Sequence, residues 1–91
     1  MEFEWDEEKA RANLNKHDVS FHQAKTVFED PLFVIFADPD HSFEEKRFVI
    51  LGESEKGGLL TVSFTERETI TRLISARKAT ASERKNYEQE I

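Results

Sequence analysis

The spacing of hydrophobic residues along the chain changes at Pro31. Before Pro31, apolar residues recur every three or four positions, a spacing typical of amphipathic helices. After Pro31, short apolar runs and strict alternation predict β-strands, and a helical segment closes the chain. The pattern predicts a short strand at residues 3–5, helices at 7–17 and 20–30, strands at 32–38, 46–54, 59–65 and 70–76, and a helix at 80–91.

The first two helices have clear boundary residues. Asp6 and Ser20 are suited to cap helix N-termini, because their side-chain oxygens accept hydrogen bonds from free backbone N–H groups. Asp18 is expected to end the first helix in a left-handed conformation, and Pro31 to end the second. Both helices are expected to pack on one face of the sheet through four apolar residues: Leu14, Phe21, Val27 and Phe28.

The last helix is also expected to begin at a capping residue. Either Thr80 or Ser82 can fill that role. Tyr87 and Ile91 are four residues apart, so both are expected to face inward and hold this helix in place.

Short turns join the strands after Pro31, and short turns favour antiparallel pairing. Gly57 and Gly58 suit one hairpin turn, and residues 66–69 form the next. Helices are expected to cover one face of the sheet and to leave the other face free. We therefore expect an α+β fold: an antiparallel sheet of four to five strands with two N-terminal helices on one face and a C-terminal helix, in the order β-α-α-β-β-β-β-α.

The length and composition bound the class of protein. At 91 residues the chain has room for a single domain, residues 1–91, with one modest core. The absence of cysteine excludes a disulfide framework, a thiolate metal site and a cysteine nucleophile. The acidic start lacks the layout of a signal peptide, and no apolar run approaches the ~20 residues of a membrane helix. A soluble cytoplasmic protein without a membrane partner is expected.

The net charge of −6 argues against a nucleic-acid partner until its distribution is considered. Residues 1–58 hold 14 acidic and 7 basic residues, whereas residues 59–91 hold 5 acidic and 6 basic residues. A phosphate ligand responds to the local field more than to the total charge. The last third of the chain is therefore suited to contact phosphates.

Two arginines are expected on the polar side of the sheet. The polar positions of strand 59–65 share one phase, and continuing that phase places Arg67 at the strand tip. Arg77 follows the polar phase of strand 70–76, although Leu73 interrupts it. Both side chains are then expected on the face that the helices leave free.

Three further cations lie close to these strands. Arg47 opens strand 46–54 with a less regular phase, and Lys78 directly follows Arg77. Arg72 falls on the opposite phase, which implies an edge position, a bulge or a carboxylate partner. Two interpretations stay open: solvated or salt-bridged arginines, or a guanidinium cluster that binds a phosphodiester through planar, permanently charged donors.

The histidines do not predict a metal site. His17, His22 and His41 lack metal-ligand spacing, and no cysteine complements them, so neither a metal nor another cofactor is expected. His17 suits the negative end of the first helix. Its alternative role is that of a general acid or base.

Two motifs give the chain a family resemblance. F-x-W-D-x-x-K-x-x-x-N-x-x-K-H runs from Phe3 to His17, and I-S-A-R-x-A runs from Ile74 to Ala79. With these motifs, and with matching segments up to Tyr87, the chain resembles the BrnT family, the ribonuclease toxins of bacterial type II toxin–antitoxin pairs. It departs from the family at Asp18, where a glycine is usual, and at Gly58, where a basic residue is usual.

The resemblance implies a RelE-like fold and metal-independent cleavage of RNA, with mRNA as substrate and inhibition of translation as the result. It also implies a BrnA-type ribbon–helix–helix antitoxin as partner, and contact with operator DNA only through that antitoxin. The alternative is a non-catalytic interaction module that acts only as antitoxin partner and co-repressor of its operon.

Metal-free cleavage of RNA needs a base for the 2′-hydroxyl, cations for the charge that develops on phosphorus, and an acid for the leaving oxygen. Under the resemblance, Arg77 and Arg47 are expected to stabilise the phosphate, and His17 to transfer a proton. The residues expected to bind RNA around them are Arg67, Arg72, Lys78 and Lys16, and Lys16 is an alternative to His17 in proton transfer.

Overall fold

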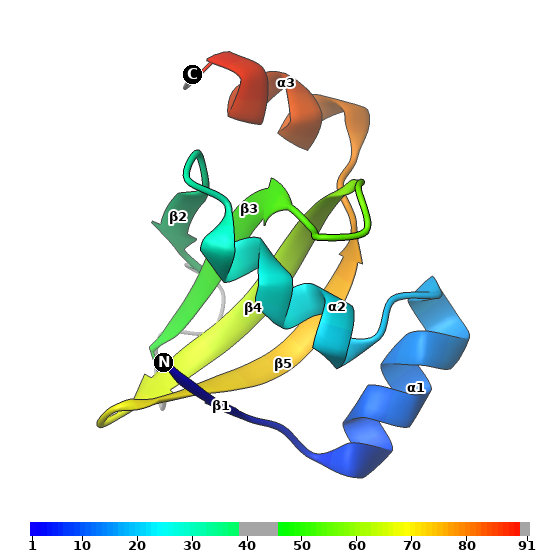
Figure 1. Ribbon diagram of the computed structural model, residues 1–91, viewed down its shortest axis with the longest axis vertical. Helices are drawn as coiled ribbons and strands as arrows, with labels where there is room; N and C mark the ends of the chain where they lie inside the picture. Colours follow the sequence, from blue (N-terminus) through cyan, green and yellow to red (C-terminus); the bar gives the residue numbers. More distant parts are fainter. Residues whose placement is uncertain (39–45, 90–91) are drawn as a thin grey trace.

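The computed structural model describes residues 1–38 and 46–89, which form a layered α+β fold (Figure 1). The elements follow the predicted order, with the second helix ending in a 3-10 turn. They are β1 (Glu2–Glu4), α1 (Glu7–His17), α2 (Phe21–Lys25), η1 (Thr26–Glu29), β2 (Val34–Ala37), β3 (Arg47–Glu53), β4 (Leu59–Arg67), β5 (Ile70–Lys78) and α3 (Ala81–Gln89). No helix within these described residues is long and apolar enough to cross a membrane.

The five strands form one sheet in the order β1-β5-β4-β3-β2. The pairs β2–β3, β3–β4 and β4–β5 are antiparallel, as the short turns predict. Gly57 and Gly58 have positive φ values of 82° and 111° in the β3–β4 turn, a conformation that glycine adopts without strain. The antiparallel prediction fails at one edge, because β1 pairs with β5 in parallel. Two helices separate β1 from the rest of the sheet, so no tight turn fixes its direction.

The expected capping residues hold the first two helices. The Asp6 carboxylate accepts hydrogen bonds from the backbone N–H groups of Glu8 and Lys9, at 2.8 and 3.1 Å. Ser20 Oγ accepts from the Gln23 N–H at 3.0 Å. Asp18 adopts the left-handed conformation at φ 58° and donates its N–H to the Leu14 carbonyl at 2.9 Å. An aspartate therefore serves as the left-handed residue that ends α1.

The core lies between α2, η1 and one face of the sheet. Phe21, Ala24 and Val27 are buried there against the apolar positions of β3, β4 and β5, and Phe28 is partly buried beside them. Trp5 packs edge-on against Phe21, with the ring centroids 5.9 Å apart. The core residues from the strands are Ile50, Leu60, Val62, Phe64, Leu73 and Ala76.

The predicted packing of Leu14 is wrong, because its side chain is 46% exposed, whereas its neighbour Asn13 is only 7% exposed. The Asn13 amide donates to the carbonyls of Val19 at 2.9 Å and Ala76 at 2.8 Å, and accepts from the Ala76 N–H at 3.0 Å. β1 pairs only with residues 70–72 of β5. Farther along the same edge of β5, the Asn13 amide forms the hydrogen bonds that a neighbouring strand would otherwise form. A buried edge needs polar partners, so a polar residue faces inward from α1.

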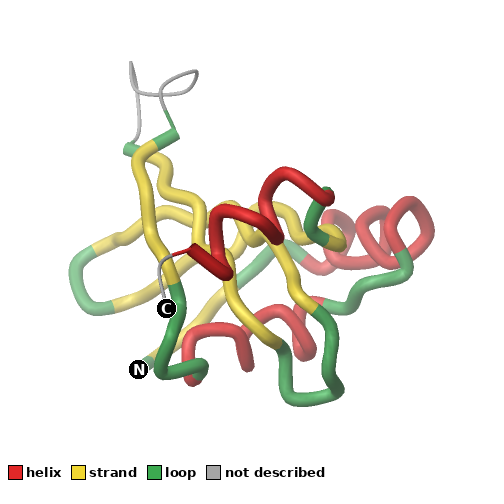
Figure 2. Tube along the Cα trace, turned by 90° about the horizontal axis from the view of Figure 1, so that it is seen from above, coloured by secondary structure: helices red, strands yellow, loops and turns green. Residues whose placement is uncertain are grey.

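Helix α3 packs on the other side of the sheet from α2 (Figure 2). Its buried Tyr87 contacts Leu51 and Leu59, which form a small second cluster with Val34 and Ala79. The expectation that the helices leave this face free is therefore wrong at one end. Tyr87 faces inward as predicted, whereas Ile91 and His41 lie outside the described residues.

Asp30 joins α3 to the rest of the molecule. Its carboxylate accepts from the Tyr87 hydroxyl at 2.5 Å and from the backbone N–H groups of Glu53 and Leu32 at 2.7 and 2.8 Å. Burial, the largest single influence, raises the pKa of Asp30, but these hydrogen bonds together lower it below its ordinary value. Gly52 allows this approach of η1 to β3, since a Cβ at residue 52 would lie 2.9 Å from Val27 Cγ1.

Candidate functional site

The face of the sheet opposite α2 carries a row of hydroxyl groups. The polar positions of β4 point away from the core residues Leu60, Val62 and Phe64, as the alternation predicts. In the strand register, Thr61 pairs with Arg77, and Ser63 pairs with Ser75. Residues directly opposite one another in a sheet share a face, so Arg77 lies on the same face as Thr61, away from the core, as predicted.

A register shift in β5 confirms the bulge that was one of the alternatives for Arg72, and it changes the face on which Arg72 was expected. The pairing moves from Ser63 with Ser75 to Phe64 with Leu73, so Ile74 is an extra residue in β5. This bulge brings both Leu73 and Ala76 to the core face, which explains the interrupted phase. Thr65 then pairs with Arg72, so Arg72 lies on the same face as Arg77 rather than on the opposite one.

The remaining two arginines of the prediction share this face. Arg47 pairs with Thr65 from the β3 side, and Arg67 pairs with Ile70 at the tip of the β4–β5 hairpin. Arg47 and Arg72 therefore flank Thr65 from two sides. We call the face defined by Arg47, Arg67, Arg72 and Arg77, with Thr61, Ser63, Thr65 and Ser75, the polar face.

A hollow of about 250 Å³ lies on the polar face beside Arg77. Hydroxyl groups from β4 and β5 form part of its wall, and α3 contributes Glu83. The described residues that line it are Phe36, Ala37, Asp38, Val49, Thr61, Ser63, Ser75, Arg77 and Glu83. The hollow therefore combines one guanidinium group, three hydroxyl groups and two carboxylates.

Arg77 and Glu83 form a bidentate pair at the rim of this hollow. Arg77 Nη1 donates to Glu83 Oε1 at 2.8 Å, and Nη2 donates to Oε2 at 2.9 Å. Glu83 Oε1 also accepts from Thr61 Oγ1 at 3.0 Å and from the Thr80 N–H at 2.9 Å. The side chains are 42% and 21% exposed, respectively. Arg77 Nη1 also donates to the Lys78 carbonyl at 3.3 Å. The guanidinium plane is thus fixed, and two of its five N–H groups lie outside these three contacts.

Glu83 is the residue of this site that the sequence interpretation missed. Hydrogen bonds from Arg77, Thr80 and Thr61 lower its pKa to about 2 although burial opposes them, so it is ionised at neutral pH. The hydrogen bond with Glu83 also raises the pKa of Arg77. The sequence did hold a signal, because T-x-x-E at residues 80–83 is a capping box, and the Thr80 hydroxyl accepts from the Glu83 N–H at 3.1 Å.

Arg72 is also paired, as one of its expected alternatives stated. Its Nη1 donates to the Glu4 carboxylate, and this contact joins β1 to β5 across their parallel pairing. The two side chains are 28% and 36% exposed. The pair therefore lies at the surface of the polar face and is partly solvated.

The other predicted cations lie apart from the hollow. Lys78 pairs with Leu60 in the register, which sets it on the face opposite Arg77, and it is exposed. Lys16 and His17 form the last turn of α1, and neither belongs to the described lining of the hollow. Asn13 of the same helix bonds to Ala76, so α1 runs beside the strand end that carries Arg77 (Figure 1).

No group of three or more histidine, aspartate or glutamate side chains within residues 1–38 and 46–89 is arranged to hold a metal ion. His22 packs its ring edge-on against Trp5, with the ring centroids 4.9 Å apart.

Known proteins resemble this chain in sequence and in fold. A family model described as "Ribonuclease toxin, BrnT, of type II toxin-antitoxin system" matches residues 5–83. The crystal structure of the Brucella abortus ribonuclease toxin BrnT is similar, with a TM-score of 0.65 and 23% sequence identity, over 88% of this chain and 97% of that chain. A search of curated proteins finds no match. The family match spans most of the chain, and the chain therefore belongs to the BrnT family of ribonuclease toxins of type II toxin–antitoxin systems.

Proposed function

We propose that this toxin is a metal-independent endoribonuclease of the cytoplasm that cuts mRNA on the polar face and thereby inhibits translation. The observation that carries the proposal is the register, which brings Arg47, Arg67, Arg72 and Arg77 to one side of the sheet. Arginine suits this task because its planar donors match phosphate oxygens and it stays charged at every working pH. Family membership supports the reaction class.

Arg77 is the proposed phosphate-stabilising residue at the cut. Its guanidinium plane is held by Glu83, so donors outside that contact are oriented before RNA arrives. Fixed donors stabilise developing charge more effectively than water does, because they need little reorganisation during the reaction. Glu83 acts in this scheme as a positioning residue.

Arg47 and Arg72 are proposed to bind neighbouring phosphates. They pair with Thr65, whereas Arg77 pairs with Thr61, four residues away along β4. At ~3.3 Å per residue, this separation is about 13 Å along the strand. Side chains anchored this far apart are suited to contact successive phosphates along a stretch of RNA backbone. This proposal differs from the sequence-based expectation, which assigned Arg47 and Arg77 together to stabilise the phosphate.

His17 is the proposed proton-transfer group, with Lys16 as the alternative. Both lie in the last turn of α1, beside the end of β5 that carries Arg77. An imidazole ring can act as a general acid or as a general base. Replacing His17 with alanine is expected to lower the cleavage rate without weakening RNA binding. If Lys16 transfers the proton instead, Lys16→Ala is expected to have this effect and His17→Ala is not.

The decisive experiment measures cleavage of RNA by purified protein. Wild type is expected to cut in excess EDTA at its ordinary rate, and Arg77→Ala is expected to be severely slowed. Arg11→Ala is a suitable matched control, because Arg11 is an exposed arginine of α1 that is not among the proposed RNA-binding residues. Loss of cleavage in EDTA that magnesium or zinc restores would refute metal independence.

Expression in cells tests the biological part of the proposal. Wild type alone is expected to arrest growth and to cut transcripts, and co-expression of a BrnA-type ribbon–helix–helix antitoxin is expected to prevent both. DNA binding is expected only for the complex. A protein that binds the antitoxin but neither arrests growth nor cuts RNA would instead be a non-catalytic partner and co-repressor.

A further inference from the structure

Exposed apolar side chains gather at one edge of the sheet. Six large hydrophobic residues are exposed within the described part of the chain, and four of them lie between residues 32 and 36. Each of the four is between 44% and 47% exposed: Leu32, Phe33, Ile35 and Phe36. A dense exposed apolar segment of this kind marks an interaction site more often than scattered single residues do.

This segment includes β2, the last strand in the sheet order. Asp38 donates its N–H to the Arg47 carbonyl at 2.9 Å, so residue 38 forms a hydrogen-bonded pair with residue 47. Such pairs alternate along an antiparallel ladder, so Phe36 and Val34 also turn their backbone groups toward β3. The N–H and C=O groups of Ile35 and Ala37 then point outward from the sheet edge. Outward groups of this kind are a template for an added strand.

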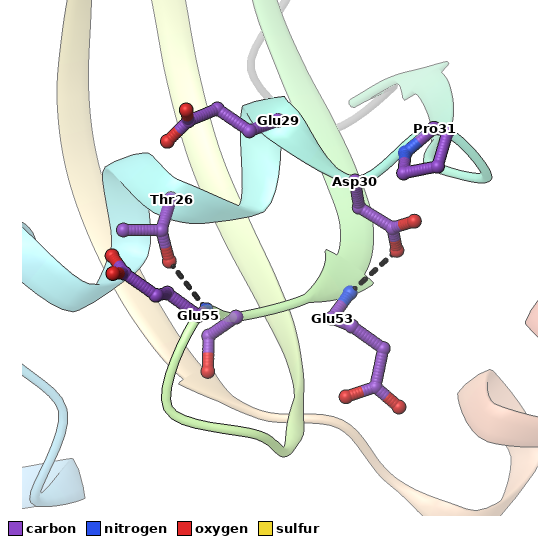
Figure 3. Close-up of a pocket in the computed structure, with 7 residues that line it drawn as sticks. Thr26, Glu29, Asp30, Pro31, Glu53 and Glu55 are labelled. Carbon is purple, nitrogen blue, oxygen red and sulfur yellow. Dashed lines mark hydrogen bonds between the residues drawn. The ribbon is translucent and has the colours of Figure 1, made fainter.

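An acidic hollow of about 450 Å³ adjoins the start of this edge segment (Figure 3). Pro31, which directly precedes Leu32, belongs to its wall. Four carboxylate residues line it: Glu29, Asp30, Glu53 and Glu55. Three of these side chains are on exposed residues, and Asp30 has a pKa below its ordinary value. Negative charge is therefore concentrated beside the start of the edge segment.

The charge distinguishes between two occupants of this edge. A second copy of the chain would bring another net charge of −6 and another acidic hollow to the same surface. The four residues of β2 also provide little area compared with the ~800 Å² per partner of a stable interface. A basic peptide has neither disadvantage, because it adds attraction at the hollow and can extend beyond β2.

We propose that an extended basic segment of the antitoxin adds to β2 as a further strand, pairing with the outward backbone groups of Ile35 and Ala37 and inserting a lysine or arginine into the acidic hollow. This inference rests on the proposed toxin–antitoxin function for the identity of the partner. This binding surface adjoins the hollow beside Arg77, because Phe36 and Ala37 lie in β2 and also line that hollow, whereas Ile35 does not line it.

The first experiment uses a synthetic probe. An end-capped peptide of seven residues, alternating lysine and valine, is titrated into ¹⁵N-labelled protein beside a second peptide with glutamate in place of lysine. The amide signals of Ile35 and Ala37 are expected to shift in a saturable manner with the lysine peptide, at least tenfold more tightly than with the glutamate peptide. Equal binding of both peptides, shifts centred elsewhere, or no shift at about millimolar peptide would overturn the proposal.

The second experiment measures binding of the cognate antitoxin by calorimetry. Ile35→Lys is compared with Leu14→Lys, because the two residues are 44% and 46% exposed and only Ile35 lies on the sheet edge. Ile35→Lys is expected to weaken binding at least tenfold, and Leu14→Lys to leave it unchanged. Unchanged binding of Ile35→Lys, or equal losses in both, would overturn the proposal.

Two further variants guard against misfolding as the cause. Ile35→Pro removes only the outward N–H, so the β2–β3 ladder is expected to persist and antitoxin binding to weaken by a similar factor. Glu29→Lys in the hollow is expected to weaken binding at least threefold, whereas Glu7→Lys in α1 is its matched control. Normal binding by a folded Ile35→Pro, or an equal effect of Glu7→Lys, contradicts the docking site.

RNA cleavage separates this inference from the proposed function. Ile35→Lys is expected to cut RNA as wild type does and to escape neutralisation by the antitoxin. If the wild type fails to cut RNA, the proposed function fails, but calorimetry still tests the edge. If Ile35→Lys cuts RNA and is neutralised normally, the docking proposal fails and the proposed function stands.

Discussion

Two arginines on the polar face pair with glutamates, and the two pairs differ in how the carboxylate is held. Glu83 receives both Nη groups of Arg77, the hydroxyl of Thr61 and the N–H of Thr80. Glu4 receives Nη1 of Arg72 at an edge where the two side chains are 28% and 36% exposed. The first pair fixes a guanidinium plane, whereas the second fastens an edge strand.

The surroundings of the two pairs also differ, because the Arg77 pair is held by more of the fold than the Arg72 pair. Arg77 borders a hollow lined by hydroxyl groups, and its partner comes from a helix that packs through Tyr87 on Leu51 and Leu59. The partner of Arg72 comes from a strand of three residues. A charged pair contributes most to chemistry where other groups orient it, and it contributes little at a solvated edge. The comparison therefore predicts unequal effects for equivalent substitutions.

The largest expected effect is on RNA cleavage by Arg77→Ala. Removing one oriented donor at a site of developing charge typically costs ~2.7–4 kcal/mol, or about 100- to 1000-fold in rate. Single-turnover cleavage of RNA measures this loss. Stability should fall by no more than about 1 kcal/mol, since the pair is partly exposed. This upper limit on the loss of stability is larger than the ~0.5 kcal/mol usual for substitution of an unpaired surface arginine.

Arg77→Lys sharpens the same prediction. An ammonium group keeps the charge but cannot reproduce the planar fork that Glu83 holds, so the cleavage rate should recover only in part. Toxicity of Arg77→Ala equal to that of wild type, at equal soluble expression, would remove the catalytic role of Arg77. Arg77 would then be a structural partner of α3.

The sequence was sufficient to predict the order of the elements along the chain, because alternation and capping are local properties. The alternating residues of β4 and the caps at Asp6 and Ser20 depend only on neighbours in the chain. The same alternation predicted the side of the sheet that carries Arg77. The face of Arg72 was not predictable in this way, since the bulge at Ile74 depends on pairing between strands.

Two other errors have a shared physical origin. Leu14 was expected in the core because it fits a helical stripe, but α1 packs against a sheet edge that needs a polar partner, and Asn13 supplies it. Glu83 was overlooked although its capping box is visible in the sequence, because its contact with Arg77 depends on where α3 packs. Side-chain patterns indicate burial, but they do not indicate which backbone groups need partners.

The second prediction concerns Arg72→Ala, with Glu4→Gln as its partner variant. Arg72→Ala should slow RNA cleavage about tenfold, since loss of a charged hydrogen bond to a neighbouring phosphate costs ~1.5 kcal/mol. Both variants should lower the free energy of unfolding by at most ~1 kcal/mol, because each breaks the contact between β1 and β5. Cleavage assays and urea unfolding separate the two effects. Slowing by Glu4→Gln equal to that by Arg72→Ala would mean that the pair, rather than the arginine, supports cleavage.

The third prediction tests how firmly Glu83 is held. Its pKa is lowered to about 2 in the folded protein from the ordinary 4.5, so the ionised form stabilises the fold above pH 4.5. That contribution is lost as the pH falls from about 4.5 to about 2. Glu83→Gln should remove this part of the acid dependence and cost roughly 1–2 kcal/mol at pH 7. Urea unfolding between pH 2.5 and 7 measures both; Glu4→Gln is the control, and an unchanged acid profile in Glu83→Gln would contradict the prediction.

The smallest expected effect is at the other attachment of α3, the hydrogen bond from Tyr87 to Asp30. Burial, followed by the Asp30 contact, raises the pKa of Tyr87 to about 12 from the ordinary 10. The protonated hydroxyl therefore stabilises the fold below pH 10, and this contribution is lost as the pH rises from about 10 to about 12. Tyr87→Phe should cost about 1 kcal/mol at pH 7, since Asp30 keeps two backbone donors. It should also remove the tyrosine-dependent loss of stability at alkaline pH, which urea unfolding between pH 7 and 12 measures.

Cleavage of RNA should persist in Tyr87→Phe, because the Arg77–Glu83 pair still orients the guanidinium group. A loss of cleavage as large as that of Arg77→Ala would show that the Tyr87 contact, rather than Glu83, positions the site.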